Sequence, residues 1–314
     1  MTMFGLDCLN NIVGLTNIEL IKKGAEATTR PEMLKFFGVC ILATRFEFNG
    51  SRRELWSSHS RTMFTQGASF GKTGMSRNRF DTLYTSVRFS FQPAERPENM
   101  RDEDYHWMLV DGFVDAFNKQ RALFFEPSSE LCVDESISRW YGQGGNWINL
   151  GLPQYVAIDR KPENGCEIQN SACAQSGIML RLKLVKTPEA EDPNIADEGM
   201  LHGTAVMKYL VEPWAHTGRL VVGDSYFASV GASRVLYNLR LQFIGVIKTA
   251  TKEYPMAYLA ALELSNRGDS KGVITHAANG QPTMMAFVWM DRERRYFITN
   301  TSSLAAGTPY SRTR

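Results

Sequence analysis

Apolar residues recur at helical spacing through the first part of the chain. The segment 28–48 contains Thr29, which can cap a helix, and its apolar residues then follow every three to four positions. The segment 76–89 repeats this arrangement, with arginines outside the apolar stripe. The longest helical pattern covers 102–125. These patterns predict a mainly helical region over residues 1–127.

After this region the pattern changes to short apolar and β-branched runs. Runs at 130–138, 154–160 and 177–185 predict three strands, which the turn-rich segment 161–168 and a loop connect. The next patterns predict, in order, a helix at 202–214, a strand at 218–227, a helix at 229–240 and a strand at 242–249. Three strands followed by helix, strand, helix and strand indicate a mixed five-stranded α/β sheet over residues 128–250.

Three further runs, at 271–278, 282–290 and 294–300, predict short strands that turn at Asn279–Gly280 and Asp291–Arg292. Residues 251–314 are therefore interpreted as a β-rich region. The longest apolar run, FFGVCILA, is far too short to span a bilayer, and the first ten residues lack the pattern of a secretory signal.

Composition changes this picture only locally. The chain is 43% hydrophobic and 22% charged, with a net charge of +2, which is too balanced to imply nucleic acid by itself. Basic residues gather in 45–90 and acidic ones in 189–198, so one part of the surface can face a polyanion or be a solvated charged face. The five cysteines show no zinc-finger spacing, which favours reduced thiols in an intracellular protein.

Two strand patterns lead directly into an aspartate. The run 131–133 precedes Asp134, and the run 220–223 precedes Asp224. If these strands are parallel neighbours, both carboxylates lie at one edge of the sheet, where a divalent cation would offset their repulsion. The alternative is that each aspartate caps a turn after its strand, which pattern alone favours.

Several stretches together resemble the transposase domain of piggyBac-type mobile elements. The resemblance rests on PSSELCVDESIS, on GLPQYVAIDRKPENGCEI and on GRLVVGDSYFASV followed by FIGVIKTATKEYP. The family pattern is matched at Asp134–Glu135, Lys161–Pro162, Gly165 and Asp224–Phe227. The likeness extends over about residues 30–314. It implies a ribonuclease H-like α/β fold.

The resemblance also implies a catalytic set of three aspartates that binds two Mg²⁺ or Mn²⁺ ions. The first two correspond to Asp134 and Asp224, as catalytic and metal-binding residues. Nothing matches the third, since Asp269 lies in a loop pattern and Asp291 in a hairpin turn. The region 251–314 is then a β-rich insertion, truncated before the last core helix, and the family's cysteine-rich zinc module is missing.

By resemblance, this is a transposase-derived domain for DNA strand cleavage and joining, inactive or incomplete without the third acid. Two alternatives stay open: a non-enzymatic DNA-binding protein of the same origin, and a decayed open reading frame. DNA is the expected partner, with Arg77, Arg79 and Arg88 as contacts. A homodimer fits the family, a membrane does not, and a nuclear location is implied.

Overall fold

The structure is a computed structural model. It describes residues 5–46, 52–57, 69–139, 158–160, 163–187, 199–248 and 251–301. The chain divides into two compact units, residues 1–120 and 121–314.

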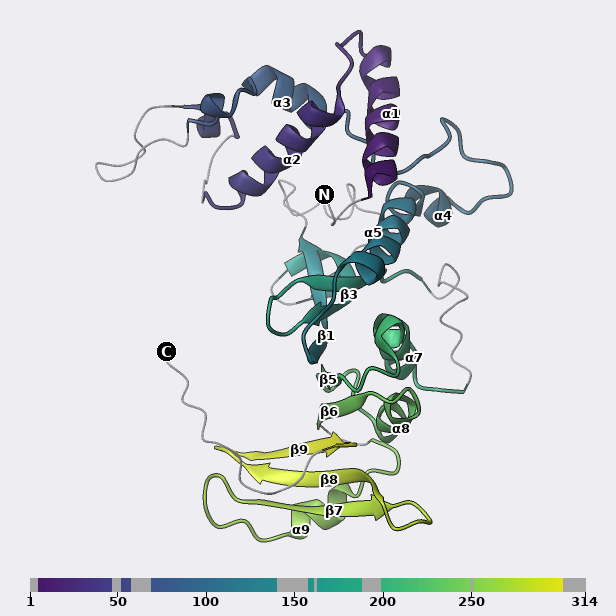
Figure 1. The fold of residues 1–314 in the computed structure, drawn as a ribbon, viewed down its shortest axis with the longest axis vertical. Helices are drawn as coiled ribbons and strands as arrows, with labels where there is room; N and C mark the ends of the chain where they lie inside the picture. The colour runs from purple at the N-terminus through teal and green to yellow at the C-terminus, as the bar shows by residue number, and fades with distance from the viewer. Residues whose placement is uncertain are drawn as a thin grey trace, which may run out of the picture. The chain divides into compact units, whose positions relative to one another are not determined.

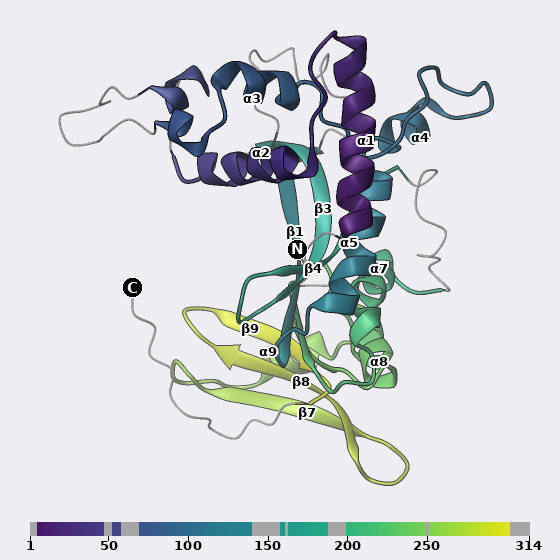
Figure 2. The same cartoon turned by 45° about the horizontal axis from the view of Figure 1, so that its top comes forward.

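Helices build the first unit (Figures 1 and 2). They are α1 (Leu6–Lys22), α2 (Arg30–Ala43), α3 (Arg77–Tyr84), α4 (Asp102–Trp107) and α5 (Asp111–Phe124), with short 3₁₀ turns at Arg52–Trp56 and Phe70–Thr73. The last helix, α5, runs across the division between the units. The mainly helical character predicted for this part of the chain is confirmed.

Hydroxyl caps define the starts of α2 and α3. The Thr29 side chain accepts a hydrogen bond from the Glu32 N–H, and the Ser76 side chain accepts one from the Arg79 N–H. Each bond satisfies one of the free N–H groups of a first helical turn. The cap predicted at Thr29 is therefore confirmed. Behind these caps, the buried faces of the helices form one apolar cluster, which includes Phe36 and Phe80.

The single helix predicted over 102–125 is wrong, because the chain forms two helices, α4 and α5, separated at Met108–Val110. The break lets Ser90 approach the start of α5. Its hydroxyl accepts a hydrogen bond from the Phe113 N–H at 2.9 Å. A Cβ at Gly112 would lie only 3.1 Å from that hydroxyl oxygen. The Ser90 hydroxyl is thus a long-range acceptor at the first turn of α5, in addition to the Val110 carbonyl, which also accepts from the Phe113 N–H at 3.0 Å.

A nine-stranded mixed sheet forms the centre of the second unit. Its strands are β1 (Glu130–Arg139), β2 (Ile158–Arg160), β3 (Glu163–Cys173), β4 (Met179–Leu184), β5 (Leu220–Gly223), β6 (Gln242–Ile247), β7 (Ser270–His276), β8 (Pro282–Met290) and β9 (Arg294–Thr299). Their order is β2-β3-β1-β5-β6-β9-β8-β7, with β4 also paired to β3. The strands β1, β5 and β6 are parallel, and the other pairings are antiparallel.

The strand β3 corrects the loop expected between 161 and 177. Its sequence, ENGCEIQNSAC, is polar and carries no alternating apolar pattern. Backbone pairing with β1 on one side and β4 on the other makes it a strand all the same. Gln169 and Ser171 are buried within it. Tertiary pairing therefore decides the conformation of a segment whose own propensity favours turns.

Three helices cover one face of the sheet. They are α7 (His202–Val211), α8 (Val230–Asn238) and α9 (Met256–Ala261), and Figure 1 draws α7 and α8 on one side of β5 and β6. Their apolar residues form a single buried cluster with those of the strands, including Val133, Val221 and Phe243. Because side chains alternate along a strand, Cys132, Asp134 and Asp224 lie on the opposite face. We call this opposite face the acid face.

The three C-terminal strands continue the same sheet, since β9 pairs with β6. The predicted strands and turns of this region are confirmed. At the β7–β8 turn, Asn279 accepts a hydrogen bond from the Gln281 N–H at 3.0 Å, and Gly280 takes a positive φ of 79°. The domain boundaries placed at 127/128 and 250/251 from the sequence stay predictions.

Candidate functional site

The two aspartates singled out in the sequence are neighbours in space. Strands β1 and β5 are parallel, and their last aligned pair is Val133 with Gly223. Asp134 and Asp224 are the next residues of the two strands. Adjacent parallel strands lie about 4.8 Å apart, so the two carboxylates start from neighbouring Cα atoms on one face. We call Asp134 and Asp224 the acid pair.

Strand β1 does not end at Asp134, in agreement with the strand predicted over 130–138. Beyond Asp134, β1 continues to Arg139 and pairs with β3 alone. Only Asp224 follows the end of its strand. Asp134 therefore projects from a long strand at the point where the parallel neighbour stops, and its side chain is exposed.

Each carboxylate of the acid pair makes one local hydrogen bond. Asp134 Oδ1 accepts from the Glu135 N–H at 2.8 Å, and Asp224 Oδ1 accepts from the Tyr226 N–H at 2.8 Å. The second bond is the turn-capping role considered as the alternative for Asp224. In the described part of the chain, neither Oδ2 atom has a hydrogen-bond partner. Capping and ligand binding are therefore compatible at this position.

Cys132 lies beside both acids on the acid face. Burial, and then the negative charges of Asp134 and Asp224, raise the pKa of the Cys132 thiol. Because both carboxylates act on one thiol, their charges converge on a common region. Both aspartates are themselves exposed to solvent.

Two adjacent carboxylates suit Mg²⁺, which in proteins keeps several waters and binds through one or two carboxylates. A site of three or more acidic, histidine or cysteine ligands is not present among the described residues. The acid pair thus fits the two-carboxylate part of a magnesium site.

The other aspartates considered from the sequence have structural partners. Asp269 Oδ2 accepts hydrogen bonds from the Ser265 and Asn266 N–H groups, at 2.9 and 2.8 Å. Asp291 forms an ion pair with Arg267 at 2.5 Å. Both lie in turns next to strands, so neither joins the acid pair. The motif residues Lys161–Pro162 lie outside the described residues.

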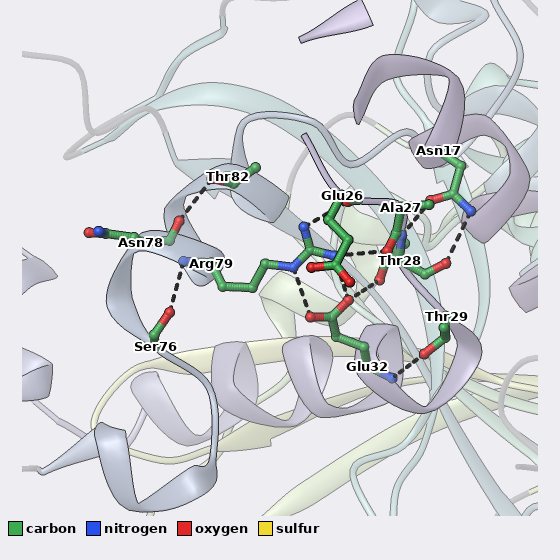
Figure 3. Close-up of polar contacts among 10 residues, drawn as sticks. All are labelled: Asn17, Glu26, Ala27, Thr28, Thr29, Glu32, Ser76, Asn78, Arg79 and Thr82. Carbon is green, nitrogen blue, oxygen red and sulfur yellow. Dashed lines mark hydrogen bonds and ion pairs between the residues drawn. The ribbon is translucent and has the colours of Figure 1, made fainter. Parts of the chain in front are cut away.

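Arg79, predicted as a DNA contact, is engaged in the packing of the first unit. Its guanidinium donates two hydrogen bonds to the Glu32 carboxylate, at 2.8 and 2.7 Å. It also donates to the carbonyls of Glu26 and Ala27. Figure 3 shows the guanidinium enclosed by these acceptors. These bonds join α3 to the segment before α2 and lower the pKa of the Glu32 carboxyl.

The other two predicted arginines differ in how strongly they are held. Arg88 donates to Glu19 at 3.2 Å and to the Val87 carbonyl at 3.1 Å. Arg77 is exposed, and its one hydrogen bond to a described residue is to its neighbour Asn78, at 3.3 Å. Of the three, Arg77 is the one whose charge faces solvent without an acidic partner in the described part of the chain.

Gly203, which the sequence did not single out, packs against the turn that follows Asp224. Gly203 in α7 allows close packing against the turn after β5, since a Cβ there would lie 2.6 Å from the Tyr226 carbonyl oxygen. A glycine opening a helix carries no such signal in the sequence, because the close approach exists only once the helix packs on the sheet.

Comparisons with known proteins also point to a transposase. A family model described as Transposase IS4 matches residues 1–314. The piggyBac transposase in a cryo-EM synaptic complex with hairpin DNA superposes with a TM-score of 0.73 at 19% identity, covering 96% of this chain and 60% of that chain. The chain therefore spans about 60% of the length of that transposase chain. The predicted resemblance to piggyBac-type transposases and the predicted mixed α/β class are confirmed.

The catalytic domain of human endonuclease V is a more distant match, with a TM-score of 0.27 at 16% identity over 55% of this chain and 67% of that chain. A TM-score this low supports no statement about the fold. No curated protein matches the sequence. None of the described helices is both long enough and apolar enough to cross a membrane.

Proposed function

We propose, from the premise that this chain belongs to the Transposase IS4 family, that its second unit carries two acids of a metal-dependent site for DNA strand cleavage and joining. The observation that carries this proposal is the parallel pairing of β1 with β5, which sets Asp134 beside Asp224. Both side chains are exposed, and each has one carboxylate oxygen without a partner among the described residues.

In this proposal Asp134 and Asp224 hold Mg²⁺ or Mn²⁺, which would supply charge stabilisation for a phosphodiester undergoing displacement. A water or a DNA 3′-hydroxyl oxygen forms the new bond to phosphorus. The bond from phosphorus to the leaving 3′-oxygen breaks. The nucleophile loses its proton to solvent, and the leaving oxygen takes up a proton from solvent to become a 3′-hydroxyl. The two aspartates would hold the cation, and no bond forms between protein and DNA.

A third acid is not assigned within the described residues, so full activity would need a further ligand. The chain as it stands is proposed to keep the metal-binding part of the site with little or no strand transfer. The nuclear location and the homodimer that the family resemblance implies belong to the same proposal.

The test is calorimetric titration of the purified chain with Mg²⁺ and Mn²⁺. The matched variant is the Asp134→Asn, Asp224→Asn double substitution, which keeps the shape of both side chains and removes both charges. We expect saturable binding to the wild type and none to the double variant. Equal binding by both proteins, or binding by neither, would overturn the proposal.

A second candidate function is DNA binding without catalysis. The exposed charge of Arg77 favours it, whereas Arg79 is committed to Glu32. Duplex binding that weakens steeply with salt, and that the Arg77→Ala variant weakens, would support this function. Binding that does not change between low and physiological salt would exclude it.

A further inference from the structure

The acid face continues from the acid pair into the C-terminal strands. Strand register places Val246 of β6 beside Asp224, and Val246 is paired with Phe297, which is paired with Phe287. Directly paired residues in a sheet project their side chains to the same face. One row of the acid face therefore runs from the acid pair to two phenylalanines.

A second row lies two residues further along β6. Trp289 and Arg295 are directly paired across β8 and β9. Lys248 follows the pair Ile247 with Tyr296, so it lies beside Arg295 at the end of β6. We call Lys248, Arg295 and Trp289 the basic–aromatic strip. From the spacing of residues and strands, its Lys248 end is about 8 Å, and its Trp289 end about 16 Å, from Asp224.

The charges of the strip have one ion pair between them in the described part of the chain. Lys248 is exposed, and the structure records no bond for its side chain in the described part of the chain. The Arg295 side chain is 54% exposed and has one ion pair, at 3.5 Å, to the still more exposed Glu293. Like charges opposite each other in a sheet repel. A bound anion would remove that repulsion.

The aromatic part of the strip is equally available. Trp289 is half-buried, and its indole N–H donates no hydrogen bond to any residue that the structure describes. In the next row, Phe287 and Phe297 stack at 5.0 Å between ring centroids, with an interplanar angle of 13°. This stacked pair lies next to the strip on the acid face.

We propose that the basic–aromatic strip binds an unpaired DNA strand beside the acid pair. A base stacks on Trp289, and backbone phosphates contact Lys248 and Arg295. Cations next to an exposed aromatic ring are the usual means of holding single strands, because every base has a stackable face and every nucleotide a charge. In an intact duplex the bases stack on one another, so they cannot stack on Trp289.

This inference rests on the proposed function, because that function is the reason for choosing DNA as the ligand. The contacts themselves come from the strip and do not involve the acid pair. The strip would hold a strand near the acids without requiring bound metal. Loss of metal binding in the acid pair and loss of strand binding in the strip are therefore separate events, and each can be measured without the other.

The experiment measures binding of a fluorescent single-stranded oligonucleotide to the full chain by anisotropy, in the presence of a chelator. The test variants are Trp289→Ala and Arg295→Ala, with Trp289→Phe as a conservative replacement. Lys271→Ala is the charge control, since Lys271 is exposed on the opposite face of the same hairpin. Tyr258→Ala removes an exposed aromatic ring from α9 as the second control. Thermal melting confirms that each variant is folded.

We expect Trp289→Ala and Arg295→Ala each to weaken single-strand binding about tenfold. Trp289→Phe should retain most of the affinity, and both controls should bind as the wild type does. The Asp134→Asn, Asp224→Asn double variant should also bind normally in chelator, whatever its metal binding shows. Arg295→Ala should lower the salt dependence by about 0.7 in the log–log slope, as expected for one lost phosphate contact.

Three results would overturn the inference: no binding of the single strand by the wild type, unchanged affinity in folded Trp289→Ala and Arg295→Ala variants, or an equal loss in the Lys271→Ala control. A wild type that prefers duplex, with no effect of Trp289→Ala, would also overturn it. None of these results bears on metal binding by the acid pair.

Discussion

The acid pair of the second unit and the Arg79 cluster of the first unit both began as charged residues with a proposed functional role, but their partners differ. Asp134 and Asp224 each use one carboxylate oxygen for a local backbone hydrogen bond. Arg79 donates four hydrogen bonds, to a carboxylate and two carbonyls, and its side chain is 19% exposed.

The comparison shows that a charge is available to a ligand only when its hydrogen-bonding capacity is not already used. Arg79 joins three segments of one unit, so its charge contributes to folding. The acid pair lies exposed on one face of the sheet, where β5 ends, and leaves acceptors free among the described residues. This difference should appear in the stability of variants, with the largest effect at Arg79.

Arg79→Ala should lower the free energy of unfolding of the first unit by about 3 kcal/mol. It removes the charge-assisted hydrogen bonds to Glu32, whose carboxylate keeps only the hydrogen bond from the Thr28 hydroxyl among those described, and it removes the Arg79 donors of two carbonyls. Urea unfolding followed by far-UV circular dichroism measures the loss. Arg77→Ala is the matched control and should change stability by less than about 0.5 kcal/mol. Equal effects of the two substitutions would remove the distinction drawn between these arginines.

Gly203→Ala should destabilise the second unit by about 2 kcal/mol through overpacking. The new methyl group would have to displace the backbone at Tyr226, in the turn that follows Asp224. Urea unfolding and metal titration should both respond. Gly38→Ala in α2, where no atom lies within 4 Å of the added Cβ, should instead stabilise its helix by up to about 1 kcal/mol. A neutral Gly203→Ala would show that the turn does not rest on α7.

Glu32→Gln should cost about 1–2 kcal/mol at neutral pH, where it weakens the pairing with Arg79. Arg79 lowers the pKa of Glu32 below its ordinary 4.5. The contribution is therefore complete above that ordinary value and is lost as pH falls through the folded-state pKa. The stability gap between wild type and variant should close on acidification. The exposed Glu95→Gln substitution should show no such closing gap, and a gap that persists in acid would contradict the assignment.

Asp224→Asn should change the stability of the second unit by less than about 0.5 kcal/mol. The asparagine carbonyl can still accept the Tyr226 N–H, and repulsion from Asp134 is relieved. Thermal melting without metal measures the effect. With Mn²⁺ added, only the wild type should gain stability, because ligand binding favours the folded state. A large loss without metal would mean that the carboxylate serves the fold rather than a ligand.

Several features could be predicted from the sequence because they depend on nearby residues. The cap at Thr29 needs only the N–H of Glu32, and the turn at Asn279–Gly280 needs only its own residues. The strands β5 and β6 follow from their apolar runs. In the site, the apolar runs marked both aspartates, and their adjacency was a conditional expectation that the β1–β5 pairing fulfils.

Other features depend on partners far along the chain. The break between α4 and α5 depends on Ser90, and the commitment of Arg79 depends on Glu32, which precedes it by 47 residues. The strand β3 has no apolar pattern and exists through its pairing with β1 and β4. Such contacts leave no periodic trace in a sequence.

By itself, the sequence determined the helical and sheet regions of this protein, the two acids and their place after apolar runs, because side-chain periodicity and capping act over a few residues. Only the tertiary structure decided that Asp134 and Asp224 are neighbours, that Arg79 is committed to the fold, and that Lys248, Arg295 and Trp289 share the acid face. Strand register and long-range pairing set these relations, since a shift of one residue would turn each strand side chain to the opposite face.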